Sequence, residues 1–173
     1  MSDAPLADAL RLRSATADDA ALVLRLIRGL AEYERLLDAC VATEDDVRAT
    51  LFGARPQAEV VIAEWAGEPA GFALFFHNYS TFLARRGLYL EDLFVLPAHR
   101  GRGIGRALLA HLARLAVERG CGRLEWAVLD WNAPAIGFYR SLGAVAQDDW
   151  TVMRVTGEAL QALAGGATGE REA

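Results

Sequence analysis

With 173 residues, the chain has the usual size of one domain, and we predict a single domain with a core at about residues 10–163 and a loose tail at 165–173. Apolar residues at 53% and charged residues at 24% exclude a disordered chain, and a net charge of -5 argues against a nucleic-acid surface. No basic start with an apolar run opens the sequence, and no segment approaches the roughly 18 apolar residues of a membrane helix, so we expect a cytoplasmic protein without membrane contact.

The first half of the chain alternates strand and helix signals. Thr16 and Thr43 each stand three residues before an aspartate, which is the layout of a helix capping box. Apolar residues then recur at helical spacing after each of them. The expected elements are a strand at residues 10–13, a helix at 18–34, a shorter helix from 43 to 53, and a hairpin of two strands at 59–65 and 70–76.

The second half contains a further strand, then a helix, then a strand. A strong amphipathic pattern predicts the longest helix, which Gly120 terminates. The expected elements are a loop at residues 78–82, strands at 88–95 and 123–129, helices at 104–117 and 132–142, and a final strand at 150–155. We therefore predict an α/β fold with a mixed, mostly antiparallel sheet and helices on both faces.

A glycine-rich hexapeptide, Arg100-Gly-Arg-Gly-Ile-Gly105, lies between the strand at 88–95 and the long helix. Backbone N–H groups at such a turn can converge on an anion at the positive end of a helix. Arg100, Arg102 and Arg106 add cations where phosphates would lie, although a turn that only begins the helix remains the alternative. The spacing excludes a Rossmann fingerprint and a P-loop. Two distant cysteines and three scattered histidines predict no disulfide and no metal site.

Four blocks of the sequence together resemble the diamine acetyltransferases of the GNAT superfamily, which include the spermidine/spermine enzymes and the thialysine N-ε-acetyltransferases. The blocks are Tyr89-Leu-Glu-Asp-Leu-Phe-Val95, Arg100-Gly-Arg-Gly-Ile-Gly105, Val128-Leu-Asp-Trp-Asn132 and Phe138-Tyr-Arg-Ser-Leu-Gly-Ala144. The resemblance spans about residues 10–163 and implies the GNAT fold. It also implies an acetyl-CoA-dependent N-acetyltransferase that works as a homodimer without a metal.

The resemblance implies a binding surface for acetyl-CoA. In similar enzymes the strand before the glycine loop presents backbone groups to the pantetheine arm, and the loop holds the pyrophosphate. The matching residues are Leu93, Phe94 and Val95 for the pantetheine, Arg100, Gly101, Arg102, Gly103, Ile104, Gly105 and Arg106 for the pyrophosphate, and Asn132, Pro134 and Ala135 for the far side of the cofactor.

The resemblance also implies two catalytic residues. An alkyl ammonium has a pKa near 10.4, so a base must free the amine at neutral pH. Glu91 matches that base, acting directly or through a water, and Tyr139 matches the acid that protonates the departing sulfur. Taken alone, Glu91 could be a structurally paired acid and Tyr139 a core aromatic residue.

The acceptor is expected to be a primary amine of a small molecule. Glu32, Glu34 and Asp92 could bind its positive charge, and Trp126 could hold a cation against its ring. Polyamine enzymes of the resembling family carry an acid where this chain has Gly29, so a lysine analogue of the thialysine type leads and di- or polyamines come second. A protein or peptide acetyltransferase and a non-catalytic acyl-CoA-binding regulatory module remain alternatives.

Overall fold

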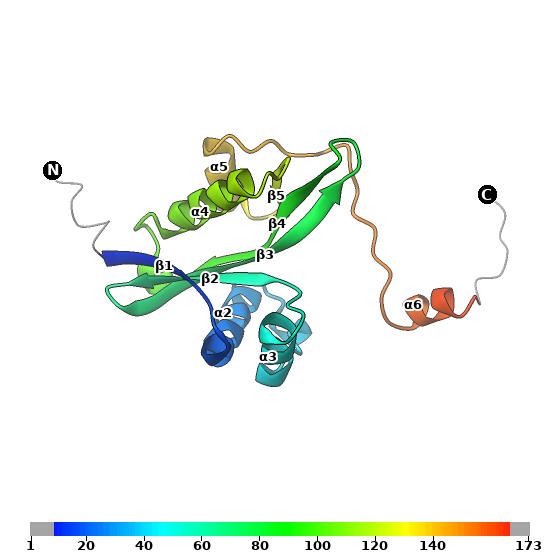
Figure 1. Cartoon of the computed structure of the whole chain (residues 1–173), viewed down its shortest axis with the longest axis horizontal. Coiled ribbons are helices and arrows are strands. Elements are labelled where there is room, and N and C mark those ends of the chain that lie inside the picture. The colour runs from blue at the N-terminus through cyan, green and yellow to red at the C-terminus, as the bar shows by residue number, and fades with distance from the viewer. Residues whose placement is uncertain (1–8, 167–173) are drawn as a thin grey trace. The chain divides into compact units, whose positions relative to one another are not determined.

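The computed structural model describes residues 9–166, which form two compact units within Met1–Ala127 and Val128–Ala173 (Figure 1). The N-terminal start and residues 167–173 of the expected tail lie outside the described residues.

The first unit is built on a five-stranded sheet in the order β1-β2-β3-β4-β5. Its strands are β1 (Leu10–Ser14), β2 (Glu59–Trp65), β3 (Glu68–Ser80), β4 (Arg85–Val95) and β5 (Leu124–Trp126). Neighbouring strands are antiparallel except β4 and β5, which are parallel. The expected mixed, mostly antiparallel sheet is confirmed. The loop expected at residues 78–82 is wrong, because β3 continues to Ser80 and pairs there with the start of β4.

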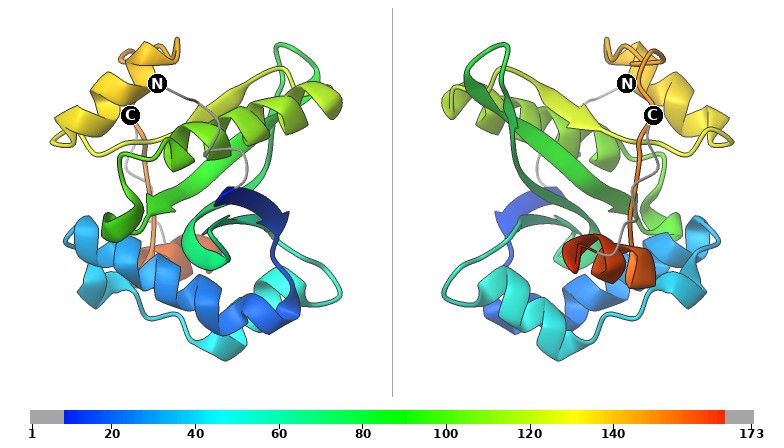
Figure 2. Two further views of the ribbon diagram at one scale, coloured as in Figure 1. Left: turned by 90° about the vertical axis from the view of Figure 1, so that its left-hand side faces the viewer. Right: turned by 90° about the vertical axis from the view of Figure 1, so that its right-hand side faces the viewer.

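Helices cover both faces of this sheet, as expected (Figure 2). α2 (Ala20–Tyr33) and α3 (Glu44–Phe52) lie on one face, and α4 (Ile104–Glu118) lies on the other. Both predicted capping boxes form, with Thr16 opening the short 3₁₀ turn η1 (Ala17–Asp19) before α2 and Thr43 opening α3. Two further 3₁₀ turns are η2 (Leu37–Ala39) and η3 (Pro97–His99).

A continuous apolar core fills the space between the sheet and the α2–α3 pair. It contains the fully buried side chains of Val23, Leu26, Ile62 and Phe72, together with the nearly buried Phe94 from β4. On the other face, α4 buries Ile104, Leu108 and Leu112. Because β4 contributes side chains to the packed layer on each face of the sheet, packing on both faces fixes its geometry.

The second unit contains α5 (Ala133–Ser141) and α6 (Gly157–Ala164), of which α6 is absent from the expected elements. The final strand expected at residues 150–155 is wrong, since this segment forms neither helix nor strand. A β-favouring run becomes a strand only when another strand supplies backbone partners. Val152 and Met153 are 82% and 87% exposed, so packing does not supply that support in the described chain. The expected strand at 123–129 is also shorter, because pairing with β4 ends at Trp126.

None of the helices in the described part of the chain is long and apolar enough to cross a membrane.

Candidate active site

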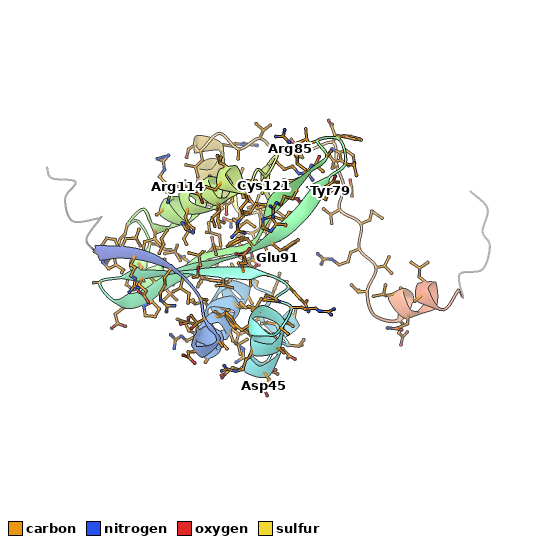
Figure 3. The ribbon with its side chains drawn as sticks, viewed as in Figure 1. Asp45, Tyr79, Arg85, Glu91, Arg114 and Cys121 are labelled. Carbon is orange, nitrogen blue, oxygen red and sulfur yellow. The ribbon has the colours of Figure 1, made fainter. Side chains whose placement is uncertain are left out.

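A β-bulge interrupts β4 at Glu91. Asp92 pairs with Leu74 of β3 and Leu90 pairs with Phe75, so Glu91 is an extra residue without an opposite partner. Such bulges bend a strand and redirect its side chains. Figure 3 shows Glu91 midway along the β3–β4 hairpin, away from Tyr79 and Arg85 near its tip. The Glu91 side chain is exposed.

The bulge moves the residues that follow it to the opposite face of the sheet. Leu90 and Phe94 are four residues apart and would share one face of a regular strand. Phe94, however, packs in the α2–α3 core, whereas Leu90 pairs with Phe75, whose ring lies under Arg119 at the end of α4. Asp92 pairs with Leu74, which packs against the α2–α3 core. The bulge therefore turns Asp92 toward α2 instead of α4.

The negative charges of Glu34 and Glu91 act on the partly buried carboxyl group of Asp92. Burial first, and then these two charges, raise the pKa of Asp92 from its ordinary value to about 6. Burial also raises the pKa of Glu34, the residue that ends α2. An acidic cluster that is partly withdrawn from water attracts a cation, because a positive charge restores the ionised state that burial disfavours. Glu32 lies on the exposed side of α2.

The close contact between α2 and β4 depends on a glycine. A Cβ atom built at Gly29 would lie 2.9 Å from Cε1 of Phe94, closer than side chains tolerate. Gly29 thus lets the Phe94 ring lie directly against the helix. This contact gives a packing reason for glycine at this position of α2.

Beyond the bulge, one edge of β4 is open. β5 pairs with β4 only from Leu88 to Leu90, and Trp126 is its last paired residue. On the other side, Leu93, Phe94 and Val95 remain paired with β3. In the part of the chain that forms this sheet, the backbone of residues 91–95 thus has no strand on its β5 side. An extended chain with amide groups can bind to such an edge.

The glycine loop that follows β4 opens directly into α4. Gly101 and Gly103 have φ angles of 76° and 75°, a left-handed conformation that favours glycine. Gly103 is the N-cap of α4, whose first turn contains no acidic residue. The first N–H groups of a helix lack intrahelical partners and bear partial positive charge. An anion can therefore bind at this turn without competition from an acid in the helix.

Two arginines of the loop are already engaged within the protein. Arg100 donates from Nε to the carbonyl oxygen of Val95 at 3.1 Å, and its guanidinium lies 4.8 Å from the centre of the Tyr33 ring. The guanidinium of Arg102 lies 5.1 Å from the centre of the Trp65 ring. The two aromatic partners, Tyr33 and Trp65, come from α2 and β2, and the sequence pattern did not indicate either of them.

The remaining predicted site residues belong to the second unit. Asn132 is buried and caps α5, since its side chain accepts a hydrogen bond from the backbone N–H of Ala135 at 3.3 Å. Pro134 lies in the first turn, where its missing N–H is not needed. Tyr139 lies on the same helix, with its ring 5.5 Å from that of Phe138.

The structure thus brings together Glu34, Glu91 and Asp92 with the edge of β4 and the glycine loop in the first unit. Trp126 belongs to this unit as well, opposite Leu90. Asn132, Pro134, Ala135 and Tyr139 form a second group on and before α5. Within residues 9–166, no group of three or more histidines, cysteines or acids could hold a metal ion.

Comparison with known families finds one matching family model. The model of the acetyltransferase (GNAT) family matches residues 29–144, which include the acidic cluster, the glycine loop and α5. Among solved structures, an integron cassette protein from V. cholerae superposes with a TM-score of 0.77 at 27% identity, covering 90% of this chain and 98% of its own.

Two curated relatives match over most of their length, and a third matches over a smaller part. Thialysine N-epsilon-acetyltransferase from Bos taurus is 41% identical, covering 89% of this chain and 96% of its own. L-ornithine N5-acetyltransferase NATA1 from Arabidopsis thaliana is 35% identical over 88% of this chain and 87% of its own. Human spermidine/spermine N(1)-acetyltransferase-like protein 1 is 33% identical over 91% of this chain but only 24% of its own.

Proposed function

The chain belongs to the GNAT acetyltransferase family, and from this premise we propose that it transfers the acetyl group of acetyl-CoA to the terminal amine of a small diamino acid of the lysine-analogue type. The acidic cluster of Glu34, Glu91 and Asp92 beside the open edge of β4 carries this proposal. Di- and polyamines are the second class of acceptor.

The first unit has the features that acetyl-CoA requires. The amide groups of its pantetheine arm can bind the backbone of Leu93 to Val95 along the open edge. Its pyrophosphate can bind the free N–H groups at the start of α4, with Arg106 in the first helical turn. Asn132, Pro134 and Ala135 would line the far side of the co-substrate.

In the proposed reaction, Glu91 accepts a proton from the ammonium group, directly or through a water, and the free amine attacks the thioester carbonyl carbon. A carbon–nitrogen bond forms and the carbon–sulfur bond breaks. Tyr139 donates its phenolic proton to the sulfur, which leaves as coenzyme A thiol. The attacking nitrogen loses its second proton, which restores the phenol of Tyr139 through water, and Glu91 releases the first proton to solvent. A backbone N–H of β4 stabilises the oxyanion that forms between these steps.

Charge and the names of the relatives support this acceptor class. Two relatives that match most of this chain act, by their names, on ornithine and on thialysine, which both carry an amine at the end of a side chain. The partly buried Asp92 and Glu34 suit one ammonium group. An added Cβ at Gly29 would lie 2.9 Å from Cε1 of Phe94, so an additional acid there, which would favour a longer polycation, would have to displace the Phe94 ring.

We also propose a homodimer. Trp150, Val152 and Met153 expose at least three quarters of their surface in a segment with strong β propensity. A second copy would supply the partner strand that this segment lacks in the described chain. Sedimentation of the wild type should give twice 18.7 kDa, and Met153→Glu should shift it toward the monomer. A wild-type monomer under assay conditions would contradict the dimer.

The acceptor is tested with a panel of amines assayed for coenzyme A release. Ornithine, lysine, thialysine, diaminobutane, spermidine and a lysine-containing peptide are compared at equal concentration. We expect the highest kcat/KM with a free diamino acid. A preference for spermidine would select the polyamine class, and a preference for the peptide would overturn the small-molecule assignment.

The base is tested with Glu91→Gln. Loss of the carboxylate should lower kcat/KM for the amine, and raising the pH should recover part of it because more free amine is then present. Asp45→Asn, which changes an exposed acid of α3, is the matched control and should behave like the wild type. A Glu91→Gln enzyme with an unchanged pH profile would exclude Glu91 as the base.

A further inference from the structure

The glycine loop is attached to the rest of the first unit by two arginine–aromatic contacts, one on each side of Gly101. Arg100 lies against Tyr33 at the end of α2, with the Phe94 ring 5.7 Å away. Arg102 lies against Trp65 at the end of β2. Stacking on an aromatic face is a favourable position for a planar guanidinium.

The two contacts hold the loop from opposite faces of the sheet. Tyr33 belongs to α2 and contacts Arg100 on the face where Phe94 packs. Trp65 alternates with Glu64 along β2 and therefore shares the face of Val61 and Ala63, outside the α2–α3 core. The loop is thus fixed across the end of the sheet, although Gly101 and Gly103 give its backbone wide freedom.

We propose that Tyr33 and Trp65 are positioning residues for acyl-CoA binding. Each aromatic ring holds one loop arginine, and together they keep the backbone N–H groups of the loop directed toward the pyrophosphate. A loop that is already ordered loses less conformational entropy when the ligand binds. This inference rests on the proposed binding of acetyl-CoA at the loop, and it assigns a role to two residues outside the loop and the acidic cluster.

If Tyr33 and Trp65 position the loop, replacing them should weaken only the binding of the phosphate part of the ligand. Tyr33→Leu and Trp65→Leu should each raise the Kd of coenzyme A by about three- to tenfold, within the range of a cation–π contact. The Kd of 3′-dephospho-coenzyme A, which retains the pyrophosphate, should rise equally. Pantetheine, which lacks phosphates, should bind the variants and the wild type alike. In steady state, KM for acetyl-CoA should rise while kcat and the KM for the amine stay nearly constant.

Conservative variants separate positioning from packing. Tyr33→Phe and Trp65→Phe keep an aromatic face for the arginine and should bind coenzyme A within about twofold of the wild type. Thermal unfolding of all four variants reports any loss of the fold. If the phenylalanine variants weaken binding as much as the leucine variants, or if pantetheine weakens in parallel, the positioning role is wrong.

Double-mutant cycles test the pairing itself. Tyr33→Leu combined with Arg100→Gln should weaken coenzyme A binding by less than the product of the two single effects, because both changes remove the same contact. In the crossed pair, Tyr33→Leu with Arg102→Gln, the two single fold-changes in the Kd of coenzyme A should multiply, as expected for independent contacts. Equal coupling in both pairs, or none in either, would overturn the assignment.

Gly103→Val distinguishes a failure of this inference from a failure of the proposed function. A β-branched residue is strained at a φ of 75°, so this variant should lose coenzyme A binding if the loop holds the pyrophosphate. Normal binding by Gly103→Val would remove the loop from the site and the inference with it. Lost binding by Gly103→Val with unchanged binding by both leucine variants would overturn the positioning role alone.

Discussion

The two structural units differ in what stabilises the residues they contribute. Every apolar side chain that is buried among the described residues belongs to the first unit, where two layers hold β4 from both sides. In the second unit Asn132 is buried, but Trp150, Val152 and Met153 are largely exposed. The acidic cluster is therefore positioned by a packed sheet, whereas Tyr139 is positioned by a short capped helix.

Because of this difference, a substitution can affect activity and folding to different degrees in the two units. A buried residue of the first unit cannot be changed without affecting a dense core, so its effect on activity has to be measured together with its effect on folding. A residue of α5 can be tested for chemistry with little disturbance of that core.

Tyr139→Phe tests whether the second unit takes part in the reaction. Removal of the phenolic proton donor should lower kcat by about 10² to 10⁴ while acetyl-CoA binding and the unfolding temperature stay nearly unchanged. Steady-state kinetics with the best amine and calorimetry with coenzyme A measure the two effects. Tyr79→Phe makes the same chemical change at an exposed site of β3 and should retain full activity. Full turnover by Tyr139→Phe, with chemistry rate-limiting, would make the tyrosine a packing residue.

Truncation of an apolar side chain in each unit measures the contrast in packing directly. Phe72 is fully buried in the α2–α3 core, and Phe72→Ala should lower the free energy of unfolding by about 3–5 kcal/mol. Val145→Ala changes an exposed side chain of the second unit, outside the segment of the proposed dimer, and should alter it by less than about 0.5 kcal/mol. Urea unfolding measures both, and Phe72→Leu provides an intermediate case if the alanine variant does not fold. Equal losses at Phe72 and Val145 would contradict the difference between the units.

The sequence predicts the elements whose signals are local. The capping residues Thr16 and Thr43 and the apolar spacing of residues 104–117 correctly indicate three helices, because these signals depend on neighbours within a few residues. The segment at 150–155 shows the limit of the same reasoning. Its β propensity is real, but strand formation depends on a partner that local composition does not specify.

The candidate site is only partly predictable for the same reason. Glu91 and Asp92 are conspicuous as consecutive acids in an apolar strand, yet the bulge that turns Asp92 toward Glu34 appears only in the pairing with β3. The contacts of Arg100 with Tyr33 and of Arg102 with Trp65 join residues that are 67 and 37 positions apart. No spacing rule links such pairs, so the structure is needed to find them.

Asp92→Asn tests whether the partly buried carboxylate of Asp92 destabilises the first unit when it is ionised. The pKa of Asp92 is raised from 3.8 to about 6, so between these values the folded state binds more protons than the unfolded state. The contribution of Asp92 to the stability of the wild type should therefore fall as the pH rises from about 4 to about 6. Asp92→Asn removes this dependence and should unfold about 1–3 kcal/mol less readily at pH 7, with a smaller difference near pH 4. It should also bind the amine more weakly.

Asp19 provides a control of opposite sign in the same unit. Hydrogen bonds from Arg13 lower the pKa of Asp19 to about 2, so its contribution is present above about pH 4 and is lost as the pH falls through about 2. Asp19→Asn should thus destabilise the protein at pH 7. If Asp92→Asn also destabilises the protein at pH 7, the ionised carboxylate of Asp92 does not destabilise the folded state.

The smallest expected effect concerns the turn beside Trp65. Ala66 and Gly67 form a two-residue connection between β2 and β3, with φ angles of 51° and 85°. A hairpin turn with positive φ at both positions favours asparagine and glycine, and alanine in this conformation is strained. Ala66→Asn should therefore raise the free energy of unfolding by about 0.5–1 kcal/mol. Gly67→Ala, which introduces the same strain at the second position, should lower it by a similar amount. Coenzyme A affinity should not change in Ala66→Asn, because Trp65 already contacts Arg102 in the native turn. A loss of stability in Ala66→Asn would show that the alanine methyl group contributes packing that outweighs its strained backbone.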